Sequence, residues 1–423
     1  MVYFMELQTA IVALLVFYVA WNLGANDVAN AMGTSVGSGA ITLKQAIIIA
    51  GVLEFLGAVL FGQEVTSTLG TKIANPVLFA TIPQTLVMGM ISVLLTAGIW
   101  LQIATARGLP VSSSHGIVGA IAGFSWVALG VEAIDWSSIG LITIGWILTP
   151  IISGAIASSL YSLIQQWIFN QPQPLSQLQE WIPWLSTLLL SVFGIIVLPT
   201  ITQPLSQFLL TEGKFNVPAH DITLFIGGIA VISLTLISWR QLVNSQIDNK
   251  IQGLFARFQV LSACFVAFAH GSNDVGNAIA PLAVISYINH QGKVPSDKLP
   301  ITLWILVLGA IGIVAGLAVW GKKVIATIGE NIISLEPSSG FCAELATAIT
   351  ILLASRLGLP VSTSHALVGG VVGIGLVQNI KSIKFATIQN IAAAWLITIP
   401  ISVALSATIF TTIMVIFKAL NWH

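Results

Sequence analysis

Long apolar stretches separated by short polar segments run along the whole chain. Four of them cover residues 139–163, 222–239, 301–320 and 391–416. A helix rises about 1.5 Å per residue, so each stretch can cross a hydrocarbon core of roughly 30 Å. The stretches are continuously apolar and do not alternate as barrel strands do, so they predict helices. The pattern indicates an all-α, polytopic membrane helix bundle.

The apolar stretches fall into two groups that follow the same order. We interpret residues 1–168 as repeat one, residues 169–256 as bridging helices with a cytoplasmic loop, and residues 257–423 as repeat two. Predicted helices lie near residues 7–23, 43–62, 86–106 and 139–163 in repeat one, near 184–198 and 222–239 in the bridge, and near 258–271, 301–320, 343–355 and 391–416 in repeat two. The loop at 240–257 carries three basic residues (Arg240, Lys250, Arg257), which predicts a cytoplasmic location.

The amino-acid composition narrows the class of protein further. Hydrophobic residues make up 56% of the 423 residues and charged residues 7%, with a formal net charge of +0 and a mean hydropathy of +0.96. We therefore expect a multi-pass integral protein of the cell membrane, with lipid as its surroundings and no nucleic-acid partner. Cys264 and Cys342 lack metal-ligand spacing and are expected to be small core residues. No basic leader precedes the first apolar stretch, so we expect a retained first helix.

Two motifs occur twice in the chain. Asn-Asp-Val-Ala-Asn-Ala at 26–31 returns as Asn-Asp-Val-Gly-Asn-Ala at 273–278, and Gly-Leu-Pro-Val-Ser-Ser-Ser-His at 108–115 returns with Thr for the middle Ser at 358–365. The copies lie 247 and 250 positions apart. Duplicated halves with interrupted helices are typical of secondary transporters, whose substrate site lies where the repeats meet. An odd number of crossings between the copies would make the repeats inverted, with broken or re-entrant helices at the centre.

The first motif places an acid in apolar surroundings. An ionised Asp27 or Asp274 near the bilayer centre costs at least roughly 2.5–3.5 kcal/mol, so something must compensate it. Each acid has two amides at i and i+4 on a shared helix face, namely Asn26 with Asn30 and Asn273 with Asn277. We also expect the helix to break at the upstream glycines, Gly24 and Gly271, and to expose backbone carbonyls. Such hard oxygens suit a small cation. The alternative is that the acids only hold the bundle together through interhelical hydrogen bonds.

The second motif combines proline with hydroxyl groups. Pro110 and Pro360 are suited to a helix start, so we expect helices to begin there. The hydroxyls that follow would lie beside free N–H groups at the positive end of a helix dipole, where an oxyanion binds. These hydroxyls belong to Ser112, Ser113, Ser114, Ser362, Thr363 and Ser364. The alternative is an ordinary N-cap followed by close helix packing, which Gly119, Gly369 and Gly370 also favour.

Three further pairs of residues have open roles. His115 and His365 could be proton relays, anion donors or hydrogen-bonded core residues, and the last is preferred. Arg107 and Arg356 are expected to reach an interface. Glu54 and Glu344 are acids embedded in apolar stretches and are candidates for cation binding, with an interhelical structural bond as the alternative.

The two kinds of motif together favour one substrate class. Hydroxyls and helix N-termini favour a tetrahedral oxyanion, whereas nearby carboxylates repel it unless cations intervene or the anion donates protons. Phosphate donates protons near neutral pH and sulfate does not. The acids therefore favour phosphate or arsenate, bound together with cations.

The duplicated motifs resemble those of the PiT family of inorganic phosphate transporters, and the resemblance spans both repeats. It implies sodium-coupled symport of inorganic phosphate, with protons as the coupling ion in some members, through an inverted-repeat bundle that forms a homodimer. Matching the motif positions implies phosphate-binding residues at Asp27, Asp274, Asn30, Asn277 and the two hydroxyl triplets. It implies a sodium site at Asn26, Asp27, Asn273 and Asp274, with Glu54 and Glu344 as further cation-binding residues.

Other functions stay open at this point. A proton-coupled phosphate, metal-phosphate or sulfate symporter is the nearest alternative, and an anion channel with weak sites is a second. A membrane enzyme acting on phosphorylated lipid is disfavoured, because no nucleophile and base pair stands out. We therefore expect no covalent catalysis, and no cofactor besides the coupling sodium ions.

Overall fold

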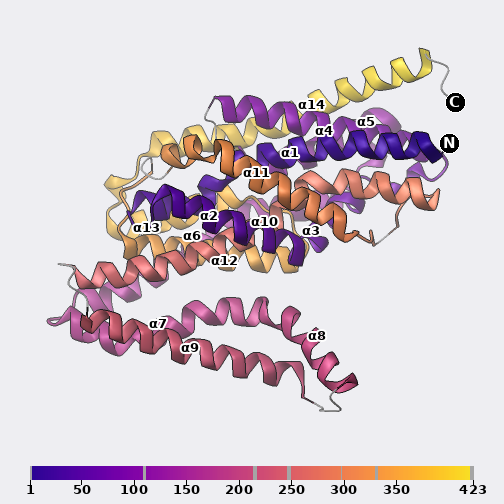
Figure 1. The fold of residues 1–423 in the computed structure, drawn as a ribbon. Coiled ribbons are helices and arrows are strands. Elements are labelled where there is room, and N and C mark those ends of the chain that lie inside the picture. The colour runs from indigo at the N-terminus through magenta and orange to yellow at the C-terminus, as the bar shows by residue number, and fades with distance from the viewer. Residues whose placement is uncertain are drawn as a thin grey trace.

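The computed structural model describes residues 2–107, 111–212, 217–244, 249–296, 298–328 and 332–419. Within these ranges it contains fourteen α-helices and no β-strand (Figure 1). The helices are α1 (Val2–Gly37), α2 (Leu43–Phe61), α3 (Gln63–Thr71), α4 (Pro83–Ala106), α5 (Ser113–Leu129), α6 (Trp136–Ile164), α7 (Pro174–Ile196), α8 (Leu198–Thr211), α9 (Ala219–Asn244), α10 (Lys250–Gln291), α11 (Leu303–Ile328), α12 (Pro337–Arg356), α13 (Thr363–Gln378) and α14 (Phe385–Ala419).

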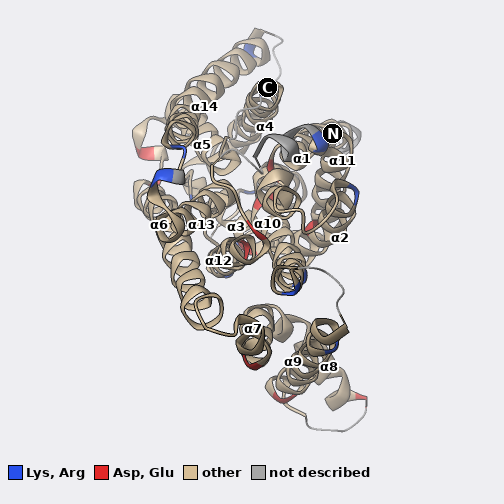
Figure 2. Ribbon diagram, turned by 90° about the vertical axis from the view of Figure 1, so that its left-hand side faces the viewer, with Lys and Arg blue, Asp and Glu red and all other residues tan. Residues whose placement is uncertain are grey.

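Ten of these helices are long and apolar enough to cross a membrane, and α5 and α13 are shorter apolar helices. Figure 2 shows how few residues of the bundle are charged. The protein is a multi-pass integral membrane protein, as the apolar stretches predicted.

The helices of the two halves interleave. The helix α1 packs most extensively against α11, and α10 packs against α2. In the same way α5 packs against α14, and α13 packs against α6. Each of these four pairs joins a helix of repeat one to a helix of repeat two, and the pairs match when the repeats are exchanged. The duplicated motifs therefore lie where helices of the two repeats pack against one another.

The bridging helices form a separate layer. Figures 1 and 2 both show α7, α8 and α9 on one side of the main bundle. The structure contains α8, which hydropathy did not predict, and the predicted loop at 240–257 is shorter than expected because Arg240 lies within α9 and Arg257 within α10. The cytoplasmic location of this loop stays a prediction.

The expected breaks at Gly24 and Gly271 are wrong, because α1 and α10 run through them without interruption. The glycines instead allow close helix packing. A Cβ at Gly24 would overlap the carbonyl oxygen of Ile313 on α11, and one at Gly271 would overlap that of Glu54 on α2. The missing side chain thus lets each motif helix touch the backbone of the opposite repeat.

The interruptions lie at the second motif. There α4 ends at Ala106 before α5 begins at Ser113, and α12 ends at Arg356 before α13 begins at Thr363. The helix α13 begins at Thr363 with Ser362 as its N-cap, so the start expected at Pro360 is wrong by three residues. Ser112 caps α5 in the same way, whereas Pro110 lies outside the described residues. Both helices therefore begin directly after a serine N-cap.

We predict that Gly24→Ala and Gly271→Ala each destabilise the fold by about 1–3 kcal/mol, because the added methyl group forces two backbones apart. Thermal unfolding of the purified protein in detergent measures the effect. Gly228→Ala on α9 is the matched control, since nothing lies within 4 Å of a Cβ there. Equal stability of the control and the two packing variants would contradict the role of the close contacts.

Candidate functional site

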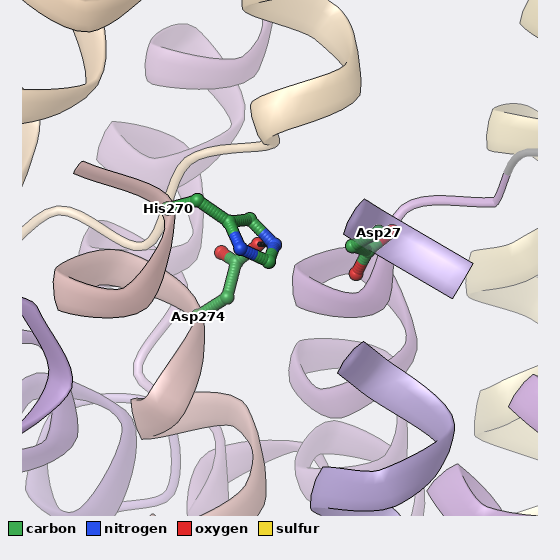
Figure 3. A group of neighbouring side chains, drawn as sticks. All are labelled: Asp27, His270 and Asp274. Atoms are coloured by element: carbon green, nitrogen blue, oxygen red, sulfur yellow. Dashed lines mark ion pairs between the residues drawn. The ribbon is translucent and has the colours of Figure 1, made fainter. Parts of the chain in front are cut away.

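The two duplicated acids lie together at the centre of the bundle. Asp27 on α1 is 2% exposed, and Asp274 on α10 is 0% exposed. One carboxylate oxygen of each, together with a ring nitrogen of His270, lie within 4.8 Å of one another (Figure 3). The structure thus joins residues that are 247 positions apart in the chain.

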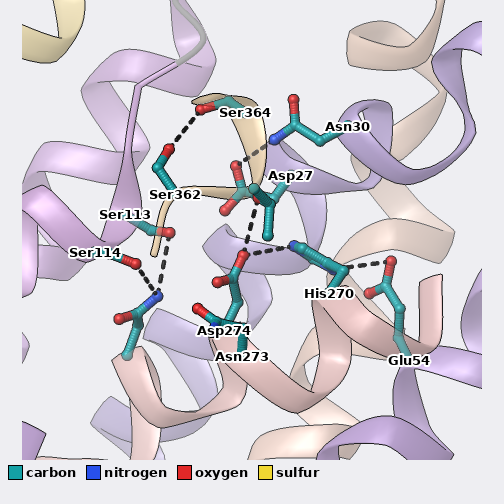
Figure 4. A network of polar contacts seen from close by, with 12 residues as sticks. Asp27, Asn30, Glu54, Ser113, Ser114, His270, Asn273, Asp274, Ser362 and Ser364 are labelled. Atoms are coloured by element: carbon teal, nitrogen blue, oxygen red, sulfur yellow. Dashed lines mark hydrogen bonds and ion pairs between the residues drawn. The ribbon is translucent and has the colours of Figure 1, made fainter. Parts of the chain in front are cut away.

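His270 connects this acid pair to a third buried carboxylate. Its Nε2 atom lies 2.9 Å from Asp274 Oδ2, and its Nδ1 atom lies 3.1 Å from Glu54 Oε1 (Figure 4). All three side chains are fully buried. Glu54 is therefore held by an interhelical contact, which was the alternative to cation binding in the sequence analysis.

The first asparagine of each motif is anchored in a matching way. Asn26 Nδ2 donates to Thr105 Oγ1 at 2.9 Å on α4, and Asn273 Nδ2 donates to Ser355 Oγ at 3.1 Å on α12. Asn273 also donates to the Leu359 carbonyl at 3.1 Å. These bonds join each acidic motif to the helix that precedes the hydroxyl triplet of its own repeat.

The second asparagine of each motif and the hydroxyls make further contacts around the acids, and the contacts of Asn277 cross from one repeat to the other. Asn277 Nδ2 on α10 donates to Ser113 Oγ at 3.3 Å and to Ser114 Oγ at 3.2 Å on α5. Thr363 Oγ1 donates to Asp274 Oδ2 at 3.2 Å, while Asn30 Nδ2 donates to Asp27 Oδ1 at 3.3 Å. Acid, amide and hydroxyl groups therefore share one site, as Figure 4 shows.

Several oxygens of this site have no hydrogen-bond donor. They are all buried side-chain atoms of the acidic motifs, namely Asp27 Oδ2, Asn273 Oδ1, Asp274 Oδ1 and Asn277 Oδ1. A buried acceptor without a donor costs free energy. Carboxylate and amide oxygens are the ligands that hard cations prefer, so this set is chemically suited to a small cation.

The hydroxyl triplets supply donors beside these oxygens. Ser112 and Ser362 are the N-caps of α5 and α13, and their hydroxyls accept from the backbone N–H groups of His115 and His365. Ser364 contacts Ser362 at 3.0 Å. Because two helix N-termini with hydroxyl side chains point into one buried region, the site is suited to an oxyanion as well.

Glu344 lies in a different polar cluster. Its Oε1 atom accepts from Thr34 and Ser35 at 2.6 Å each and from Gln259 at 3.1 Å, and its Oε2 atom accepts from Ser262 at 2.9 Å. The four donors come from α1 and α10. They stabilise the buried carboxylate and tie α12 to both motif helices.

The two halves differ beside the acids. Gly24 packs on Ile313 and Gly271 packs on Glu54, so Ile313 and Glu54 occupy matching places. His270 precedes Asp274 by four residues, and Leu23 precedes Asp27 by four. The buried polar pair His270–Glu54 beside Asp274 therefore corresponds to an apolar pair, Leu23–Ile313, at the matching place beside Asp27.

Some of these residues were missing from the sequence-based site. His270 could have been predicted from sequence because it lies four residues before Asp274 on the same helix. Thr105 and Ser355 could have been predicted because they lie 250 positions apart, as the repeated motifs do. The two arginines that precede the hydroxyl triplets, Arg107 and Arg356, are exposed as expected. The guanidinium of Arg356 lies 5.4 Å from the centre of the Phe61 ring.

Comparison with known proteins gives consistent matches. The model of the phosphate transporter family matches residues 23–406. A provisionally named phosphate permease of Haemophilus influenzae is 41% identical over 411 residues, which cover 96% of this chain and 97% of the relative. The chloroplastic inorganic phosphate transporter 2-1 of Arabidopsis thaliana is 40% identical over 423 residues, covering 94% of this chain and 70% of the relative.

One solved structure has the same architecture. It is described as the sodium-dependent phosphate transporter, with a TM-score of 0.86 and 36% sequence identity. The match covers 97% of this chain and 99% of the solved chain. The all-helical membrane fold is therefore confirmed by an independent structure.

Proposed function

Because the chain belongs to the phosphate transporter family, and is not an enzyme, we propose that it carries inorganic phosphate by sodium-coupled symport with alternating access. Phosphate would bind between the N-termini of α5 and α13, next to the acidic motifs. Sodium would bind the oxygens of Asn26, Asp27, Asn273 and Asp274.

The observation that supports this proposal most strongly is the shared location of donors and acceptors. Asn277 contacts Ser113 and Ser114, and Thr363 contacts Asp274. The hydroxyl and amide donors attract an anion, whereas the carboxylates at such short range repel it, so the site suits an anion that arrives with cations. A cation between carboxylate and phosphate oxygens is attracted by both, which couples the binding of the two solutes.

The burial of the site favours alternating access over a channel. The acids are at most 2% exposed, and the triplet hydroxyl residues are at most 6% exposed. An ion channel needs a continuous water-filled path with weak sites. A buried, fully enclosed site instead requires a conformational change for each binding and release step.

Radiolabelled phosphate uptake into proteoliposomes tests the proposal directly. We expect saturable uptake against the phosphate gradient when an inward sodium gradient is imposed, and little uptake when choline replaces sodium. Uptake that follows a proton gradient without sodium would favour the proton-coupled alternative. Flux that never exceeds equilibrium would favour a channel.

We predict that Asp27→Asn lowers the sodium affinity measured in this assay by about 10-fold or more, because the substitution removes a charge at nearly constant volume. Membrane insertion should change little. The matched control is Asp221→Asn, since Asp221 lies at the exposed start of α9. Wild-type sodium dependence in the Asp27 variant would contradict a cation role for this residue.

The combined substitution Ser113→Ala and Thr363→Ala should raise the apparent KM for phosphate roughly 10-fold, because two hydroxyl donors are lost while backbone donors remain. The combined substitution Ser159→Ala and Thr411→Ala is the control, because both residues are exposed. If the KM is unchanged in the first double variant, the hydroxyls do not bind phosphate.

The homodimer implied by the family resemblance is also a proposal. We expect light scattering of the purified protein in detergent to give the mass of two copies of the 44.7 kDa chain. A mass of one copy would contradict the homodimer.

A further inference from the structure

Two histidines that the transport site does not use lie against each other in the core. His115 on α5 and His365 on α13 are 250 positions apart, yet their ring centroids are 4.8 Å apart at an interplanar angle of 89°. They are 5% and 6% exposed. They follow directly after the two hydroxyl triplets, so their placement affects both halves of the proposed phosphate site.

Each histidine is bonded to the opposite repeat. His115 Nδ1 lies 3.3 Å from the carbonyl oxygen of Trp395 on α14, and His365 Nδ1 lies 3.1 Å from that of Trp146 on α6. A carbonyl only accepts, so each Nδ1 carries the hydrogen and donates it. The rings of Trp146 and Trp395 pack on His115 and His365 at centroid distances of 3.9 and 3.7 Å. Each tryptophan therefore packs on one histidine and accepts a hydrogen bond from the other.

Proline explains why one of these carbonyls needs a partner. Pro150 lies inside α6, four residues after Trp146. Proline has no N–H, so the usual helix hydrogen bond to the Trp146 carbonyl is missing. His365 supplies the absent donor.

Further bonds make the two helix starts depend on each other. Ser114 Oγ on α5 donates to the Val361 carbonyl at 2.9 Å, just before α13. Trp146 Nε1 donates to the Pro360 carbonyl at 3.0 Å in the same segment. The backbone just before one hydroxyl triplet is thus bonded to α5, which carries the other triplet, and to α6.

We propose that His115 and His365 are paired positioning residues that set the phosphate affinity by holding both hydroxyl triplets in register across the repeats. The inference rests on the proposed phosphate function and deepens it. Neither histidine needs to touch the anion, because each acts through the first turn of its own helix. The Nε2 atoms of both rings are buried without a hydrogen-bond partner, so the Nδ1 donor carries the role.

The two ring nitrogens can be tested separately. The side-chain amide nitrogen of asparagine lies near the position of Nδ1, whereas that of glutamine reaches toward Nε2. His115→Asn and His365→Asn should therefore keep the bond to the tryptophan carbonyl. His115→Gln and His365→Gln should lose it at a similar or larger side-chain volume.

The experiment measures radiolabelled phosphate binding to the purified full-length protein in sodium, together with thermal unfolding of each variant. We expect each glutamine variant to weaken phosphate binding about three- to tenfold, as the loss of one hydrogen bond does, and each asparagine variant to stay within about twofold of wild type. The double glutamine variant should be weakened less than the product of the two single effects, because the pair acts as a unit. His220→Gln at the exposed start of α9 is the control.

The results distinguish failure of the positioning role of the two histidines from failure of the proposed phosphate function. Wild-type binding by the glutamine variants, or equal weakening by asparagine and glutamine that follows the loss of thermal stability, overturns the positioning role alone. If the wild-type protein binds no phosphate in sodium, the proposed function fails and the inference fails with it.

Discussion

The whole architecture depends on keeping carboxylates buried in an apolar bundle. One carboxylate oxygen each of Asp27 and Asp274 and a ring nitrogen of His270 lie within 4.8 Å of one another, and both acids are buried. Such a cluster is unfavourable unless positive charge or donors surround it. The structure meets this requirement in part with His270, Thr363 and Asn30, and leaves further oxygens without donors. In our account these oxygens are what the transported cation binds.

Some contacts around the acids occur in both halves of the molecule, whereas others occur once. The asparagine anchors, the serine N-caps and the His–Trp contacts occur in both halves. The His270–Glu54 pair and the donors around Glu344 occur once, and the place that matches Glu54 holds Ile313. The contacts that occur in both halves give the site two helix N-termini with hydroxyl groups. The contacts that occur once make the surroundings of the two acids chemically different. Asp274 has a built-in imidazole neighbour, and the residue matching that imidazole beside Asp27 is leucine.

Much of this was predictable from sequence because the motifs are duplicated and the spans are strongly apolar. The structure brings acids, amides and hydroxyls together, with Asn277 on Ser113 and Thr363 on Asp274, while the binding roles assigned to them stay a prediction. The helix breaks predicted at Gly24 and Gly271 are wrong. A glycine can either interrupt a helix or allow close helix packing, and these two glycines pack against Ile313 and Glu54 within continuous helices. The interleaving of the repeats was not predicted, since local periodicity carries no information on which helices meet. His270 was not predicted because the first motif has Leu23 at the matching position, so the duplication that marks the other site residues does not mark this one.

The most direct test is an electron-density map of the protein with sodium and arsenate, whose arsenic atom can be located by anomalous scattering. The account predicts one tetrahedral anion between the N-termini of α5 and α13, with cation density at the oxygens of Asp27 and Asp274. Arsenic located away from both hydroxyl triplets, or an anion bound there with no cation near either acid, would contradict it.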